Sequence, residues 1–211
     1  MIKMRILVVL AAIACAVVTN VTPASAFFKA SSGKYPVTIS VTSNEVQKIA
    51  IEPNLVMECT GLTLTGSLQR EGSQLTVAPT YSGCTAKLNG SSFGGVVLKT
   101  NGCIYNFHQA KGATTGTLSL ECPGSNSIQF EAALGCILKI GKNPNIGTVK
   151  YANIGSGTTE EIEVKQALVN MAFTSSGCLG LIPTSGTNLK VEGGFKIKGT
   201  MGGTQTGILV A

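Results

Sequence analysis

The chain has 211 residues, a formal net charge of +6 and 26 glycines, with a single histidine and no tryptophan. All ten acidic residues are glutamate, which excludes calcium loops of the Asp-x-Asp kind and a Ser/His/Asp catalytic triad. The basic residues are scattered, with no basic run and no interleaved aromatic residues, so nucleic acid is not an expected partner.

The N-terminal residues 1–26 have the pattern of a secretory signal peptide. Basic residues come first, an apolar stretch follows at 6–18, and Ala24-Ser25-Ala26 forms a small-x-small cleavage site. The apolar stretch is shorter than the roughly 20 residues that a membrane-spanning helix needs. We therefore predict that this segment is cleaved after Ala26.

Cleavage would leave a mature chain, 27–211, with 14 basic and 10 acidic residues and a net charge of +4. We predict no transmembrane segment in this mature chain, and we expect a secreted protein that is extracellular or held at the cell surface. Lipid attachment at Cys15 is the competing interpretation, but apolar residues follow this cysteine where a polar tether would be expected.

From residue 35 onward, the sequence indicates a series of short β-strands. Most segments have about four to nine residues, alternate apolar with polar side chains, and end at Gly, Asn, Pro or Ser. In chain order, the expected strand segments are 35–42, 46–51, 55–68, 74–84, 84–88, 94–100, 103–108, 115–122, 127–132, 136–140, 147–155, 159–173, 188–200 and 204–210.

These segments predict an all-β fold: a disulfide-stapled antiparallel β-sandwich or barrel-like fold built of short hairpins. Residues 160–173 could also form a helix, although Ile162 and Val164 alternate as in a strand. We expect a single secreted β-rich domain over 27–211, with a subdivision near 90–95 as the alternative.

Six cysteines remain after cleavage, and an even number in an exported chain predicts disulfides. None has C-x-x-C spacing and only one imidazole is present, so we expect neither a metal site nor a cofactor. The predicted disulfide residues are Cys59, Cys84, Cys103, Cys122, Cys136 and Cys178.

Hairpin symmetry narrows the pairing, because residues that face each other across a hairpin lie equally far from the centre of its turn. The three favoured pairs are centred on glycine-containing turns: 59–84 at Glu71-Gly72, 103–122 between Gly112 and Ala113, and 136–178 at Gly157. Cys84–Cys103, centred near Phe93-Gly94, remains a competitor.

The chain offers few groups for catalysis. His108 is the single imidazole, and alternation turns it away from the face shared by Tyr105 and Phe107. A paired-carboxylate mechanism could draw on Glu160, Glu161 and Glu163, which cluster after a turn, or on Glu58 and Glu121, which each precede a cysteine. Both groups are more typical of solvated strand positions, so we predict no catalytic residues.

The order of glycine and cysteine positions in 75–84, 101–107, 118–123, 127–140 and 149–155, followed by a last cysteine and 202–210, resembles uncharacterised predicted secreted proteins of soil actinobacteria. The resemblance covers most of the mature chain and implies an exported β-rich protein. It carries over no active site.

The sequence favours a non-catalytic extracellular protein, either a surface or matrix component or a binding module, whose partner is an extracellular protein or a glycan. The first alternative is a secreted inhibitor of a hydrolase that presents a loop such as 141–147. The second is a glycoside hydrolase that uses two glutamates.

Overall fold

The computed structural model describes residues 28–211 except 44, 52–54, 110–113 and 133–134. In this part of the chain nearly all regular structure is antiparallel β-strand, and η2 (Gly157–Thr159) is a short 3-10 segment. The predicted all-β, barrel-like fold is therefore confirmed. The predicted signal peptide, 1–26, lies outside the described residues.

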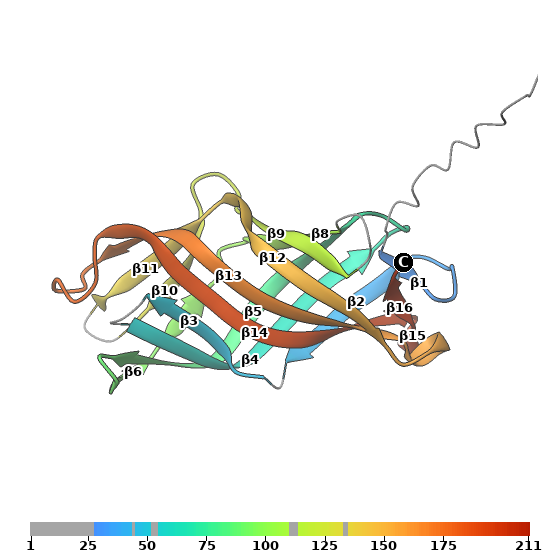
Figure 1. The fold of residues 1–211 in the computed structure, drawn as a ribbon, viewed down its shortest axis with the longest axis horizontal. Coiled ribbons are helices and arrows are strands. Elements are labelled where there is room, and N and C mark those ends of the chain that lie inside the picture. The colour runs from blue at the N-terminus through green and yellow to red at the C-terminus, as the bar shows by residue number, and fades with distance from the viewer. Residues whose placement is uncertain (1–27, 44, 52–54, 110–113, 133–134) are drawn as a thin grey trace, which may run out of the picture.

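The strands form an elongated eight-stranded barrel (Figure 1). A closed ring runs β2, β4, β5, β8, β9, β12, β13, β14 and back to β2, so the ring strands stand in chain order, with other strands inserted between some of them. The other wall strands extend this ring lengthwise. The wall strands are β2 (Val37–Ser43), β3 (Gln47–Ile51), β4 (Leu55–Leu68), β5 (Gln74–Leu88), β6 (Ser91–Gly95), β7 (Val97–Lys99), β8 (Ile104–Gln109), β9 (Thr115–Glu121), β10 (Ser127–Glu131), β11 (Ile137–Gly141), β12 (Asn143–Ile154), β13 (Glu161–Ser176) and β14 (Ser185–Met201).

The extension works because short strands lie end to end along the long ones. Both β2 and β3 pair with β4 on one side and with β14 on the other. In the same way, β6 and β8 pair with β5, and β11 and β12 pair with β13. One set of long strands therefore runs through the whole molecule, and the segment near 90–95 is the strand β6 of the wall rather than a linker.

The two ends of the barrel differ. At one end, which we call the terminal end, β1 (Phe28–Ala30) pairs with β16 (Ile208–Val210), and β15 (Thr204–Thr206) pairs with β14. Phe28 is fully buried there, with its ring 5.5 Å from that of Tyr151 in an edge-to-face contact. The opposite end, which we call the distal end, contains the turn at 89–90 and the loop 177–184.

Some strands merge or extend the segments that the sequence indicated: β5 joins 74–84 and 84–88, and β14 begins at Ser185 rather than at 188. β13 has 16 residues and β14 has 17, and residues 161–173, which could have formed a helix, lie in β13. Gly66, Pro79 and Gly193 lie inside strands rather than at their ends. In a closed barrel most strands are paired along both edges, and this pairing outweighs the weak strand preference of glycine and proline.

A buried polar network interrupts the apolar interior where β2 gives way to β3. The fully buried Gln47 donates hydrogen bonds from Nε2 to Ser43 Oγ and to the carbonyl oxygen of Gly194, both at 3.2 Å. Gln166 Nε2 donates to Gln47 Oε1 at 3.2 Å. A Cβ on Gly193 would overlap Gln47 Oε1, so glycine is what lets this amide approach β14.

The three disulfides join the predicted partners: Cys59–Cys84, Cys103–Cys122 and Cys136–Cys178, with Cα separations of 3.9, 4.1 and 4.3 Å. In the first hairpin Cys59 faces Cys84 directly between β4 and β5. In the second, Ile104 faces Glu121, the register that the predicted turn centre implies. The competing Cys84–Cys103 bond is absent from these pairs.

The third hairpin is less regular than its cysteine spacing suggested. Near the turn, Val149 of β12 faces Gln166 of β13, a register that would place Ile137 opposite Cys178 if it continued unchanged. Ile137 instead faces Ser176, because the register shifts between β12 and β11. The pairing of these cysteines was predicted correctly, but strict hairpin symmetry does not hold up to the disulfide.

Replacing Cys103 and Cys122 together with alanine should lower the free energy of unfolding. The bond spans a sequence separation of 19, for which the chain-entropy model gives about 3 kcal/mol. Urea unfolding of both proteins measures the loss. Peptide mapping of the unreduced wild-type protein must recover the 103–122 link, and a peptide joining Cys103 to Cys84 would contradict the structure.

Gly193→Ala should destabilise the barrel by about 1–3 kcal/mol, because the added methyl group displaces a buried, hydrogen-bonded amide. Gly95→Ala is the matched control, since a Cβ there meets nothing within 4 Å. Adding Gln47→Ala to Gly193→Ala should recover part of the loss in urea unfolding. If the two glycine substitutions lowered stability equally, the position of the Gln47 amide would not depend on the missing side chain at Gly193.

Candidate functional site

Side chains fill the interior of the barrel, as expected for eight strands. Phe107 and Phe195 meet edge to face there, with ring centroids 5.9 Å apart. The hydroxyl oxygens of Tyr81 and Tyr105 lie 2.9 Å apart within hydrogen-bond distance. The candidate binding sites therefore lie at the ends of the barrel and on its outer surface.

The two interior tyrosines have perturbed acidities. Burial raises the pKa of Tyr81 well above its usual value, and the charge and hydrogen bond of Tyr105 raise it further. Burial also raises the pKa of Tyr105, although its hydrogen bond with Tyr81 acts in the opposite direction. Both hydroxyls therefore remain protonated at alkaline pH values at which a solvated tyrosine ionises.

His108 lies on β8 with its side chain on the face opposite to Phe107, as predicted, but it is half-buried. Its Nε2 is 3.1 Å from Ser119 Oγ on β9. Ser119 is only 4% exposed, so a substrate could not reach its hydroxyl as it would a catalytic nucleophile. We interpret this pair as a structural hydrogen bond between neighbouring strands.

The clustered glutamates have separate surroundings. Glu160 accepts a 2.7 Å hydrogen bond from Ser31 at the terminal end, while Glu161 forms a 3.1 Å ion pair with Lys198. Glu163 lies opposite Lys196 on β14. Glu121 is exposed at the end of β9. The sequence brought Glu160, Glu161 and Glu163 together, but the structure places Glu160 in a different hollow from the other two.

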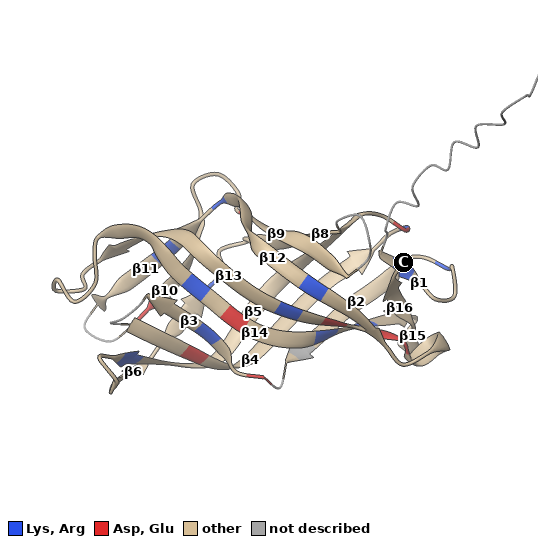
Figure 2. Cartoon of the chain, viewed as in Figure 1, with Lys and Arg blue, Asp and Glu red and all other residues tan. Residues whose placement is uncertain are grey.

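Lysines and glutamates alternate across the outer face of the barrel (Figure 2). Glu192 of β14 faces Lys48 of β3, which faces Glu58 of β4. The Glu58 carboxylate in turn lies 2.9 Å from Lys87 Nζ on β5. Such exposed pairs contribute about 0–1 kcal/mol each, so this row favours strand register more than overall stability.

Carboxylates and basic groups also share three polar surface hollows. The terminal hollow contains Lys29, Arg70, Glu71 and Glu160. The β13–β14 hollow contains Glu45, Glu161, Glu163, Lys196 and Lys198, and the β12–β13 hollow contains Lys150, Glu163 and Lys165. Each hollow is thus lined by charges of both signs, and in the β13–β14 hollow Lys198 and Glu161 form an ion pair.

The distal end carries a small apolar cavity of about 20 Å³, which we call the apolar mouth. Its lining residues are Leu55, Met57, Leu88, Phe93, Phe130, Ala132, Cys136, Leu138, Leu181 and Ile182. The loop 177–184 buries Ile182 but leaves Leu179 78% and Leu181 37% exposed. The Cys136–Cys178 disulfide holds the start of this loop against the start of β11.

Sequence reasoning did not identify the apolar mouth. Phe93 lies within a Gly/Ser-rich segment, Leu179 and Leu181 alternate with glycine, and all three lie outside the strand segments expected from the sequence. The available signal was the presence of large apolar residues in turns, where solvated side chains are usual.

All six predicted disulfide cysteines are bonded. Across the described ranges, no group of three or more His, Cys, Asp or Glu side chains is arranged to hold a metal ion. The same part of the chain contains no helix that is long and apolar enough to cross a membrane.

Comparisons with known proteins found no matching family model, no matching curated protein and no matching solved structure. The class of protein is thus defined by its own geometry: an eight-stranded antiparallel barrel with three disulfides, covered at one end by its terminal strands. The resemblance to predicted secreted actinobacterial proteins stays a prediction.

The tyrosine pair predicts a loss of stability at alkaline pH. Because the pKa values are raised in the folded state, the unfolded chain releases these protons first, as the pH rises past about 10. Stability should therefore be constant below that pH and decline above it. Urea unfolding from pH 8 to 11 should show a shallower decline for Tyr81→Phe/Tyr105→Phe. The stability of the control Tyr35→Phe should decline as steeply as that of the wild type. An equally steep decline in the Tyr81→Phe/Tyr105→Phe variant would contradict the role of this pair.

Proposed function

We propose that this protein is a non-catalytic extracellular binding module, a surface or matrix component that docks through its apolar mouth. The observation that carries the proposal is the exposure of Leu179 and Leu181 beside a cavity lined with apolar side chains. Transfer of one leucine side chain out of water contributes about 1.5–3 kcal/mol, so a soluble domain that exposes two beside an apolar cavity gains by covering them.

The size of the cavity favours a large partner over a small ligand. Pockets that enclose small molecules usually have volumes of roughly 300–1,000 Å³, whereas the apolar mouth measures about 20 Å³. It can accept the tip of one apolar group, with the exposed leucines covered by the surface that carries this group. Of the partners that the sequence allowed, an extracellular protein fits this chemistry better than a glycan.

The disulfides support an extracellular location. Three disulfides are consistent with an oxidising compartment, and such bonds are rare in the cytosol. The predicted signal peptide, 1–26, would deliver the chain to that compartment, and we include secretion in the proposal on this ground.

The alternative functions have less support. Segment 141–147, which a hydrolase inhibitor would present as a loop, is held in the wall at Asn143 and Gly147, which face Leu120 and Leu118 of β9 with a bulge between them. Ile146, in the same segment, is buried in the interior. For a glycoside hydrolase, the carboxylates of these hollows already have partners in the protein: Glu161 forms an ion pair with Lys198, and Glu160 accepts a hydrogen bond from Ser31.

Leu179→Ser/Leu181→Ser should weaken docking without unfolding the barrel, because both side chains are partly or largely exposed. Fluorescently labelled mature protein is added back to washed cells of the producing strain, and the retained fraction is measured. We expect retention of the double variant to fall by about tenfold, the effect of losing about 1.4 kcal/mol. Val169→Ser, which changes a 51% exposed apolar residue on β13, is the matched control.

Equal retention of wild type and the leucine variant would contradict docking through the apolar mouth. Hydrolysis of a polysaccharide panel that is lost in Glu71→Gln or Glu160→Gln would contradict the non-catalytic assignment and restore the glycoside hydrolase hypothesis.

A further inference from the structure

A fourth polar hollow lies on the outer face of the barrel, beside β10 and β11, with a volume of about 320 Å³. We call it the lysine hollow. Its lining residues are Ser125, Asn126, Ser127, Lys139, Gly141, Lys142, Asn143, Ala172, Phe173 and Thr174. None of them belongs to the apolar mouth.

The lysine hollow differs from the other three polar hollows in its charge. Two lysines line it and no carboxylate does, whereas each of the other three contains at least one glutamate. In the described part of the chain, Lys139 and Lys142 take part in no ion pair or side-chain hydrogen bond. The positive charge of this hollow is therefore not offset by its own walls.

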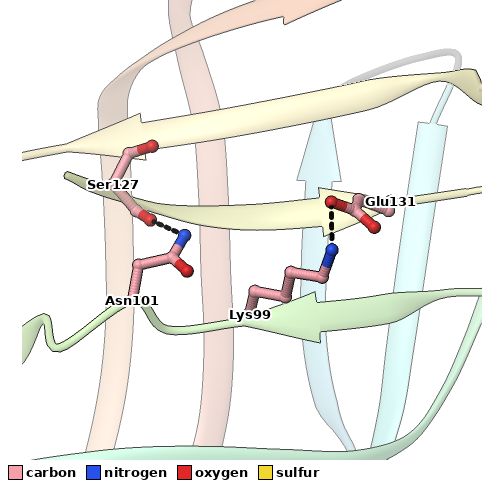
Figure 3. Close-up of polar contacts among 4 residues, drawn as sticks. All are labelled: Lys99, Asn101, Ser127 and Glu131. Atoms are coloured by element: carbon pink, nitrogen blue, oxygen red, sulfur yellow. Dashed lines mark hydrogen bonds and ion pairs between the residues drawn. The ribbon is translucent and has the colours of Figure 1, made fainter.

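Glu131 on the adjacent strand β10 does not neutralise the lysines of this hollow. Glu131 of β10 points toward Lys99 of β7, and its Oε1 lies 2.8 Å from Lys99 Nζ (Figure 3). Lys139 faces Gln129 on β10 and Thr174 on β13, both uncharged. Among the described residues, therefore, none that lines the lysine hollow or faces Lys139 supplies a negative charge.

The rim of the lysine hollow is held in place. Asn101 Nδ2 donates a 2.9 Å hydrogen bond to the carbonyl oxygen of Ser127, as Figure 3 shows, and Asn126 Nδ2 donates a 2.8 Å bond to the carbonyl oxygen of Asn101. The Cys103–Cys122 disulfide joins the two segments just beside these contacts. A bound group would thus meet a rim that is already ordered.

Neutral hydrogen-bond donors complete the lining. Asn143 Oδ1 accepts the backbone N–H of Asn145 at 3.1 Å, which leaves its NH2 group as the donor. Thr174 adds a hydroxyl that has no hydrogen-bond partner among the described residues. Ammonium, amide and hydroxyl donors around one hollow match the acceptor oxygens of a phosphate or sulfate group.

We propose that the lysine hollow binds a phosphate or sulfate ester group carried by an extracellular polymer. This site is independent of the apolar mouth, because it uses different residues and a different chemistry. The ammonium groups are exposed, so the attraction is screened by salt within about 10 Å at 0.1 M ionic strength. Binding should therefore weaken as the salt concentration rises.

Calorimetric titration of the mature protein at low salt tests this site, with dextran sulfate, polyphosphate and neutral dextran as probes. We expect the protein to bind at least one of the two anionic polymers and not to bind neutral dextran. The anionic polymer that binds more tightly identifies the preferred group, sulfate or phosphate. Lys139→Ala/Lys142→Ala should weaken this binding by about tenfold, as the loss of two direct charge contacts implies. The matched control Lys48→Ala/Lys87→Ala removes the same charge from strands β3 and β5 and should change the affinity by less than about twofold.

Equal weakening in the two double variants would overturn the proposal, since it would show diffuse attraction to the whole basic surface. Absence of binding to both anionic polymers at low salt would overturn it as well. Because the apolar mouth is untouched in all four lysine substitutions, retention on cells through Leu179 and Leu181 is measured separately and tests only the proposed function.

Discussion

The closure of the barrel by β14 against β2 and β3 is the constraint on which the rest of the structure depends. The other ring pairings join strands that have at most two other strands between them along the chain, whereas this seam joins the first wall strands to the last one. Without it, both strands would present free edges and the apolar interior would be open to water along one side. The buried network lies on this seam, since Ser43 and Gln47 both donate to the carbonyl oxygen of Gly194.

That placement explains why a polar group occupies an otherwise apolar interior. A purely apolar seam would tolerate a slip of β14 by two residues with little change in the pattern of side chains. The amide of Gln47 is satisfied by Ser43, Gln166 and the Gly194 carbonyl at one register, and a slip would bury it without partners. Gly193 allows the close approach, so the two adjacent glycines of β14 act in register selection.

Local features of the fold could be predicted from the sequence, and features that depend on closure could not. The Cys103–Cys122 bond and the pairing of Ile104 with Glu121 follow from symmetry about one turn, which involves a single hairpin. The shift between β12 and β11 depends on β9, β10 and β13 together, so the spacing of Cys136 and Cys178 did not reveal it. The candidate sites were missed for the same reason: Lys139 and Thr174, or Phe93 and Leu181, become neighbours only when strands distant in the chain pair in the wall.

The same disulfides that fix the hairpins also fix the two proposed surfaces. Cys136–Cys178 anchors the loop that carries Leu179, and Cys103–Cys122 anchors the rim that carries Ser127. Each surface is therefore presented by a cross-linked part of the barrel, which lowers the ordering entropy that binding would otherwise require. Reduction of the protein is expected to affect recognition even under conditions in which the barrel stays folded.

The pairing of β1 with β16 determines how the molecule would be oriented if it were attached to a surface. Residues 28 and 210 lie side by side at the terminal end, so a tether attached at either one leaves from the same place (Figure 1). The 17 residues of β14 correspond to a length of roughly 55 Å before tilt. A support that holds the terminal end would therefore keep the distal loop, which carries Leu179, several nanometres away from its own surface.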